Sequence, residues 1–397
     1  EATFNRPVRV DEAVEMRCEE TDGGLAIELA NAGAPAVRIK LVLTETRVAL
    51  DDAVAMPPAT PPRTPKAVAD AALATHQGEL AHYLDRALLD EVLPGLGAHL
   101  PASQIALLLS TTRLVGMQCP GEHSIYAGLT LNLDPTAAES TLRYRVTRFD
   151  PRFGAVRIAL EGDAARGQIE AFVRPPPQTQ PDYEGLRVRV DAGRFAGQRA
   201  LVIGGSRGLG ELCVKALVAG GAEVCFTYHR GEADARRVAA TLPEGRARFV
   251  RCDAADPQAP AAGFNMAPTH LYYFATPFIF AGVRGRFSDT LYRRFSQIYI
   301  EGFWGLADAL AARGLEAVLY PSSVAVDEWP PGMHEYAVAK RGGEAVCEAL
   351  ARQHPLCIHR PRLPRLNTDQ TASNIPVPCK DATEVMLREL FALADMA

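Results

Sequence analysis

A glycine-rich segment at residues 204–210 constrains the fold of this chain more than any other feature. It reads Gly204-Gly-Ser-Arg-Gly208-Leu-Gly210, directly after the apolar run Ala200–Ile203, and a helix-like pattern over 208–219 follows it. Glycines between a strand and a helix allow a tight turn and a close backbone approach. The free amide groups at the start of the helix then face an anion. The segment therefore predicts a dinucleotide site at the edge of a parallel sheet.

Short apolar strands and helices alternate throughout the C-terminal part, residues 185–397. We expect strands at 199–204, 222–228, 246–251, 270–275, 316–321 and 356–360, and helices at 208–219, 231–241, 288–313 and 334–353. This alternation is typical of a Rossmann-type, doubly wound α/β sheet with right-handed crossovers. Its ligand is expected at the carboxyl ends of the strands.

The residues expected to bind the cofactor follow from this layout. The segment 226–230, Phe-Thr-Tyr-His-Arg, contains no carboxylate to accept a ribose hydroxyl, whereas Arg207 and Arg230 can pair with a phosphate. NADPH is therefore favoured over NADH. Asp253 is placed to accept from an adenine amino group, with a simple turn aspartate as the alternative. The full set is Gly204, Ser206, Arg207, Gly208, Leu209, Gly210, Arg230, Asp253, Ala275 and Lys340.

Tyr336 and Lys340 are the candidate catalytic pair. They lie four residues apart in the helix expected at 334–353, so their side chains share one face. A neighbouring ammonium can acidify a phenol, whose ordinary pKa near 10 makes it a poor catalyst at neutral pH. Ser323 precedes the tyrosine by thirteen residues and follows a predicted strand. A chance Tyr-x-x-x-Lys pattern on an exposed helix is the alternative.

These motifs give residues 198–397 a resemblance to the short-chain dehydrogenase/reductase family, and within it to reductases of 3-oxoacyl thioesters. The resemblance implies that Tyr336 transfers the proton, that Lys340 also holds the nicotinamide ribose, and that Ser323 hydrogen-bonds the substrate carbonyl. Ser322 is less favoured than Ser323 for this hydrogen bond because of its spacing to Tyr336. The implied activity is NADPH-dependent ketone reduction in a fatty-acid-like or polyketide-like pathway.

Several positions depart from the pattern of that family. Tyr299 stands where a helix asparagine supports a relay water, Phe274-Ala-Thr-Pro277 replaces Asn-Ala-Gly, and Ile203 replaces a threonine. The closing strand with its Asp-Gly-Gly end is not evident, because the chain finishes in the helical pattern 382–397. These departures reduce the support for turnover but not for cofactor binding, so the alternative function is a non-catalytic acyl- or nucleotide-binding component of a multienzyme.

The arginines of segment 360–365, Arg-Pro-Arg-Leu-Pro-Arg, follow the last predicted strand. The resemblance places there the loop that covers the nicotinamide. These arginines can bind an acidic substrate group or a carrier-bound phosphopantetheine, and a solvated basic loop is the favoured alternative.

A proline-rich linker, residues 176–184, is expected to separate a different domain at residues 1–175. This domain has strand-like segments at 26–29, 37–44, 141–148, 154–160 and 167–173 around a mainly helical stretch from about 67 to 114. Two segments, Phe4-Asn-Arg-Pro-Val and Ser110–Ser124, resemble the α+β double hot-dog fold of MaoC-like enoyl-thioester hydratases. The resemblance implies that the first hot-dog is cut, with its central helix before Glu1.

Hydratase activity is not carried over to this domain. The family's Asp-x-Asn-Pro-x-His stretch corresponds to residues 74–85, where no aspartate precedes a histidine at that spacing. An acyl-binding or dimerising module is the favoured interpretation. A dehydratase using His76, His82 or His123 as an acid–base group is the alternative.

Composition excludes several other classes of function. The net charge is −5 and no long tract of one sign occurs, so neither nucleic acid nor anionic lipid is expected as a partner. No apolar run suggests a membrane span, and the eight scattered cysteines favour a cytoplasmic protein with reduced thiols. The Cys119/His123 and His354/Cys357/His359 groups do not supply four convergent ligands, so no metal is expected. The expected partners are an acyl thioester, free or carrier-bound, and further subunits in a homo-oligomer or larger multienzyme.

Overall fold

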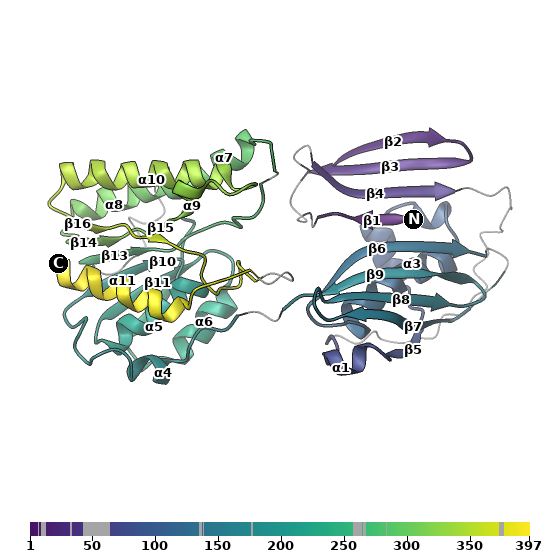
Figure 1. The fold of residues 1–397 in the computed structure, drawn as a ribbon, viewed down its shortest axis with the longest axis horizontal. Helices are drawn as coiled ribbons and strands as arrows, with labels where there is room; N and C mark the ends of the chain where they lie inside the picture. Colours follow the sequence, from purple (N-terminus) through teal and green to yellow (C-terminus); the bar gives the residue numbers. More distant parts are fainter. Residues whose placement is uncertain are drawn as a thin grey trace. The chain divides into compact units, whose positions relative to one another are not determined.

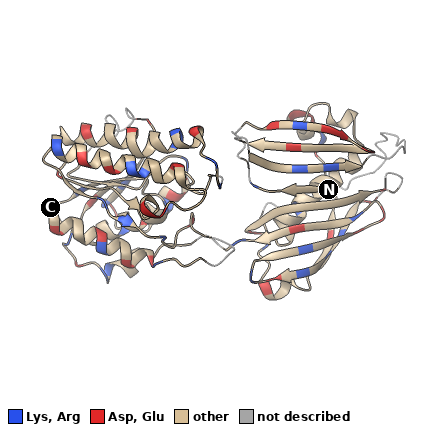
Figure 2. Ribbon diagram, turned by 45° about the horizontal axis from the view of Figure 1, so that its top comes forward, with Lys and Arg blue, Asp and Glu red and all other residues tan. Residues whose placement is uncertain are grey.

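The computed structural model describes all residues except 7, 9–12, 32–33, 43–63, 135–136, 138, 176–177, 257–263, 265–266, 283 and 373–376. Contacts divide the described chain into two compact units, one covering residues up to 175 and the other beginning at 178. Parts of two predicted features, the strand 37–44 and the linker 176–184, lie outside the described residues. Lysine and arginine are interspersed with aspartate and glutamate on both units (Figure 2).

The N-terminal unit contains an antiparallel sheet in the order β2-β3-β4-β1-β6-β9-β8-β7-β5 (Figure 1). Its strands are β1 (Ala2–Phe4), β2 (Glu15–Thr21), β3 (Gly24–Asn31), β4 (Ala34–Val42), β5 (Gln77–Ala81), β6 (Ser124–Leu133), β7 (Thr141–Asp150), β8 (Ala155–Glu161) and β9 (Ala165–Val173). Its helical elements are α1 (Asp70–Leu73), α2 (Arg86–Val92), η1 (Leu96–Ala98), α3 (Ala102–Arg113) and the π-helical turn η2 (Leu114–Gln118).

The core of this unit lies between the sheet and the helical segment α3–η2. Leu114 and Val115 are buried together with Val146, Val156 and Ile158, which alternate with exposed residues along β7 and β8. This period of two is what one buried sheet face requires. The mainly helical stretch expected from 67 to 114 contains α1, α2, η1 and α3. It also contains the strand β5, which is defined by its pairing with β7 and not by a local pattern.

The C-terminal unit contains a six-stranded parallel sheet in the order β12-β11-β10-β13-β14-β16 (Figure 1). Its strands are β10 (Arg199–Ile203), β11 (Glu223–Tyr228), β12 (Ala247–Arg251), β13 (His270–Tyr273), β14 (Ala317–Leu319) and β16 (Cys357–His359). The pair β15 (Ser322–Ser323) and β17 (Arg362–Leu363) forms a separate short parallel ladder. The predicted Rossmann-type sheet is confirmed.

Helices cover both faces of this sheet because its central strands are apolar on both sides. On β10, Ala200 and Val202 join a core with α5 (Gly208–Ala219) and α11 (Ala382–Met396), whereas Leu201 and Ile203 join a core with α8 (Phe303–Ala311) and α10 (His334–Gln353). The remaining helical elements of this unit are α4 (Tyr183–Arg187), α6 (Glu232–Ala240), α7 (Asp289–Ser296), the π-helical turn η3 (Gln297–Gly302) and α9 (Ala325–Glu328).

One predicted helix is interrupted in a way that matters for the site. The helix expected at 288–313 consists of α7, the π-helical turn η3 and α8. A Cβ on Gly302 would lie 1.9 Å from the carbonyl oxygen of Ala254, so only glycine allows this close approach. The extra residue in the π turn directs Tyr299 into the interior, where it is fully buried.

Candidate active site

The predicted glycine turn forms between β10 and α5. Gly204 and Gly208 have φ angles of +79° and +55°, in the left-handed region that favours glycine. A Cβ on Gly210 would lie only 2.1 Å from the carbonyl oxygen of Gly204. Thr227 at the end of β11 anchors the turn, because its hydroxyl accepts from the Gly204 amide at 2.9 Å. Glycine at these positions therefore keeps the backbone of the turn accessible, because a side chain there would strain the turn or clash with it.

A cavity of about 760 Å³ lies at the carboxyl ends of the strands and contacts this turn. This volume is within the range of small-molecule and cofactor sites. Of the predicted site residues, only Arg230 is not part of the lining. The lining includes Gly204, Ser206, Arg207, Gly208, Leu209, Gly210, Asp253, Ala275, Ser323, Tyr336 and Lys340. A glycine cradle beside a cavity of this size fits a dinucleotide.

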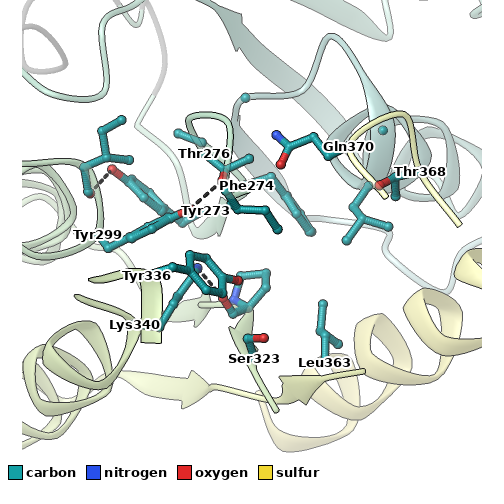
Figure 3. A pocket seen from close by; sticks show the side chains of 18 of the residues that line it. Tyr273, Phe274, Thr276, Tyr299, Ser323, Tyr336, Lys340, Leu363, Thr368 and Gln370 are labelled. Atoms are coloured by element: carbon teal, nitrogen blue, oxygen red, sulfur yellow. Dashed lines mark hydrogen bonds between the residues drawn. The ribbon is translucent and has the colours of Figure 1, made fainter. Parts of the chain in front are cut away.

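Tyr336, Lys340 and Ser323 come together along one wall of the cavity (Figure 3). Burial raises the pKa of Tyr336 to about 12, and the nearby Ser323 hydroxyl opposes that rise. Ser322 is occupied elsewhere, because its hydroxyl donates to the buried Glu344 carboxylate at 2.6 Å. The same carboxylate pairs with Arg362 at 2.6 Å and so joins β15 to β17.

The ammonium of Lys340 is buried behind Tyr336. Its Nζ donates to the carbonyl oxygen of Pro321 at 2.7 Å, and the residue is 6% exposed. Burial lowers the pKa of Lys340 to about 7. Near neutral pH this side chain is therefore close to the midpoint of its titration, although the free amine titrates more than three units higher.

Two pairs of polar side chains lie at the opposite end of the cavity. Arg207 Nη2 lies 2.9 Å from Asp369 Oδ2, and His229 Nε2 lies 3.7 Å from Asp253 Oδ2. Of the later arginines, Arg360 pairs with Glu348 on the surface, whereas Arg365 lines the cavity with its guanidinium over the Phe280 ring, at 5.2 Å.

Sequence reasoning did not find the apolar part of the lining. It comes from the segments 274–280 and 330–333, from β17 and from the segment after it, and includes Phe274, Phe278, Ile279, Phe280, Met333 and Leu363. The run Phe274–Phe280 after the fourth strand was the available signal, since a polar loop is usual at that position. These side chains make the cavity suitable for a substrate with an apolar portion.

The three candidate histidines belong to the N-terminal unit and do not line this cavity. His82 is buried, with Nδ1 at 2.9 Å from the Ser110 hydroxyl, and burial lowers its pKa. His76 is stacked on Tyr144, with ring centroids 5.8 Å apart, and His123 has a φ of 62°. The three histidines therefore have separate surroundings in the N-terminal unit and are not part of the cavity described above.

Within the described residues, no group of three or more histidine, cysteine, aspartate or glutamate side chains could hold a metal ion. The described part of the chain also contains no helix with the length and apolar character of a membrane span. All eight cysteines are free thiols.

Residues 198–356 match the family profile of the short chain dehydrogenases. Over these residues the C-terminal region is similar to the short-chain dehydrogenases. This similarity supports an NAD(P)-dependent short-chain oxidoreductase. The matched residues include the glycine turn, Ser323, Tyr336 and Lys340. No curated protein matches the sequence significantly.

Several solved structures resemble about half of this chain. BdcA in complex with NADPH is 27% identical, with a TM-score of 0.45 over 51% of this chain and 88% of that one. A short chain dehydrogenase from Burkholderia cenocepacia in complex with NADP is 23% identical, with a TM-score of 0.45 over 50% of this chain and 91% of the other. A short-chain dehydrogenase/reductase from Serratia marcescens is 19% identical, with a TM-score of 0.46 and the same coverages.

Proposed function

We propose that the C-terminal unit is an NADPH-dependent ketoreductase that acts on a 3-oxoacyl thioester. The observation that carries the proposal is the convergence of Tyr336, Ser323 and Lys340 on the cavity that also contacts the glycine turn. When bound, the reduced nicotinamide supplies a hydride. The glycine turn and Arg207 hold the phosphates, Ser323 orients the ketone oxygen, and Tyr336 donates the proton to it.

The buried environment of Tyr336 suits proton donation. Its raised pKa keeps the phenol protonated at neutral pH, so it serves as the acid in the direction of reduction. Lys340 in its ammonium form favours the phenolate that remains after the transfer. The apolar lining around Phe278, Phe280 and Met333 accommodates an acyl chain and excludes water from the reacting ketone.

The thioester assignment is supported by the N-terminal unit. Its antiparallel sheet packed on one buried helical segment is compatible with the hot-dog fold expected from the sequence, which suggests thioesters as common ligands. In this proposal residues 1–175 form the hot-dog-like module and 185–397 the reductase, in an assembly that handles acyl groups. Arg365, which faces the cavity, is a candidate contact for an acidic group of the carrier arm.

The test is NADPH oxidation by the whole chain with a short 3-oxoacyl thioester, with a simple ketone of similar size in parallel. Wild type should oxidise NADPH with the thioester, and Tyr336→Phe should lose at least a hundredfold in kcat while NADPH fluorescence still reports binding. Ser323→Ala should lose activity strongly. Ser322→Ala is the matched comparison and should lose much less, because its hydroxyl contacts Glu344 and not the phenol, and the bonds from Arg362 to Glu344 remain.

Two results would overturn parts of the proposal. Equal negligible rates in wild type and Tyr336→Phe, with NADPH still bound, would identify a nucleotide-binding component and not a reductase. Turnover of the simple ketone without turnover of the thioester would leave the oxidoreductase in place and reject the substrate class.

A further inference from the structure

The ammonium of Lys340 is enclosed by two aromatic rings. Its Nζ lies 4.0 Å from the centroid of the Tyr299 ring and 4.8 Å from that of the Tyr320 ring. The faces of aromatic rings carry negative partial charge and attract a cation within about 6 Å. Together with the Pro321 carbonyl oxygen, these rings are the groups that stabilise the ammonium in a site with almost no solvent.

Tyr299 is held in place from several sides (Figure 3). Its hydroxyl is hydrogen-bonded to the Thr276 hydroxyl at 2.5 Å, and its ring stacks on Phe295 with centroids 5.9 Å apart. Its backbone carbonyl accepts from the Tyr320 hydroxyl at 3.1 Å, which ties the two rings of the enclosure together. The π turn η3 supplies the backbone geometry. The position of the ring is therefore fixed independently of Lys340.

The same ring also contacts the proposed proton donor. Tyr299 and Tyr336 meet edge to face, with centroids 5.8 Å apart and an interplanar angle of 76°. One side chain thus contacts both members of the pair that the proposed chemistry needs. It does so at the position where the resemblance places an asparagine that supports a relay water, so an aromatic contact replaces a polar one.

We propose that Tyr299 is a positioning residue whose ring face, and not its hydroxyl, holds the Lys340 ammonium charged and next to Tyr336. The kinetic consequences of this inference rest on the proposed reductase function, but the charge state of Lys340 does not. Tyr299 then acts through Lys340 and contacts neither hydride nor ketone.

The groups around Lys340 make its charge sensitive to this ring. Tyr336, Glu344 and Cys347 lie on its own helix. Tyr299 faces it from η3, and Tyr320 faces it from the position directly after β14. The Glu344 carboxylate, which is also paired with Arg362, opposes the effect of burial and raises the pKa of Lys340. Because burial already lowers the pKa of Lys340 to about 7, losing a ring face should shift its charge within the working pH range.

The experiment replaces Tyr299 by phenylalanine and by singly, doubly and triply fluorinated phenylalanine. These side chains keep the shape of the ring, while fluorine progressively removes the negative charge of its face. The pKa of Lys340 is followed by the pH dependence of its acetylation by acetic anhydride, read by peptide mass spectrometry. The pH profile of kcat is measured on the same proteins.

Tyr299→Phe should leave the pKa of Lys340 unchanged, because the ring face is intact. Its kcat should stay within about twofold of wild type. The fluorinated series should lower that pKa stepwise, by roughly one unit at triple substitution, and should shift the pH profile of kcat by the same amount with little change in KM. Fluorination at Phe295, which stacks on Tyr299 and has no cation over its ring in the described contacts, is the matched control.

A pKa that does not change along the series would overturn the inference, as would a Tyr299→Phe variant that behaves like the triply fluorinated one. The labelling result needs no turnover. Inactivity with a stepwise shift in the pKa would therefore reject the reductase and keep the role of Tyr299, whereas activity without the shift would do the reverse.

Discussion

Arg207 in the glycine turn and Asp369 in the segment after β17 form an ion pair, with 2.9 Å between Nη2 and Oδ2. The pair joins the turn to the segment that lines the opposite side of the cavity. Asp369 Oδ1 is buried without a hydrogen-bond partner among the described residues. In the proposed NADPH complex, the phosphate on the ribose would therefore have to compete with a carboxylate for the same guanidinium.

Asp369→Asn should strengthen NADPH binding. The amide keeps the shape of the side chain but removes the nearer of the two carboxylates paired with Arg207, the other being Asp234 at 3.7 Å. We therefore expect Kd for NADPH to fall about two- to fivefold, the scale of one partly exposed ion pair. Kd for NADH should change less than twofold, because it lacks the phosphate. Fluorescence titration with both dinucleotides measures this.

Asp289→Asn, which disrupts an exposed pair with Arg293 on α7, is the control and should change neither Kd. Equal changes for NADPH and NADH would mean that Arg207 does not bind the ribose phosphate.

Gly210→Ala should weaken dinucleotide binding and lower stability. The new methyl group would meet the Gly204 carbonyl oxygen at 2.1 Å, and that atom is backbone in a turn fixed by Thr227. The turn has to open, so we expect Kd for NADPH to rise at least tenfold and stability to fall by about 1–3 kcal/mol, as for overpacking. Gly97→Ala is the control, since nothing lies within 4 Å of its added Cβ. Unchanged binding in Gly210→Ala would show that this turn does not hold the cofactor.

The sheet of the C-terminal unit was predictable because its signals are local. The helix α10 has the expected bounds, 334–353, since Pro330-Pro-Gly332 precedes it and Pro355 follows it. β10 and α5 followed from the apolar run and the glycines between them.

The features that were missed depend on contacts distant in sequence. The π turn η3 depends on the approach of Gly302 to Ala254, and no local pattern shows it. The strand β2 is exposed throughout and rich in glutamate, so its pairing with β3 could not be predicted from hydrophobic alternation. The partners of Lys340 were likewise unpredictable, because Tyr299 and Tyr320 come from separate elements of the fold.

Glu344→Gln should disturb Ser323 more than it disturbs the cofactor site. The carboxylate accepts from Ser322 and from Arg362 Nε and Nη2, at 2.6, 2.8 and 2.6 Å, and so fixes the ladder of β15 with β17. An amide cannot accept all three bonds, so we expect a loss of about 1–3 kcal/mol in stability. The kcat for ketone reduction should fall more than tenfold with Kd for NADPH nearly unchanged. Glu348→Gln, which affects the exposed pair with Arg360, should change neither stability nor kcat.

Lys340 should make the stability of the C-terminal unit rise with pH above neutrality. Burial lowers its pKa in the folded state to about 7, below the ordinary value of 10.5, so between these values the unfolded chain binds more protons than the folded one. The free energy of unfolding then increases with pH in that window, by up to about 1.4 kcal/mol per pH unit from this group. Below about pH 7 both the folded and the unfolded chain bind this proton. The contribution of Lys340 to the free energy of unfolding then no longer changes with pH.

The measurement compares urea unfolding of wild type and Lys340→Met from about pH 7 to 10. Both tryptophans, Trp304 and Trp329, lie in the C-terminal unit, so their fluorescence reports on that unit alone. Methionine keeps the apolar stem without the charge, and its variant should lack the rising component, so the two curves diverge as pH increases. Lys380→Met removes an exposed lysine and should follow wild type. Parallel curves for wild type and Lys340→Met would mean that the buried ammonium keeps its proton across this range, held by the Tyr299 and Tyr320 rings more strongly than burial opposes it.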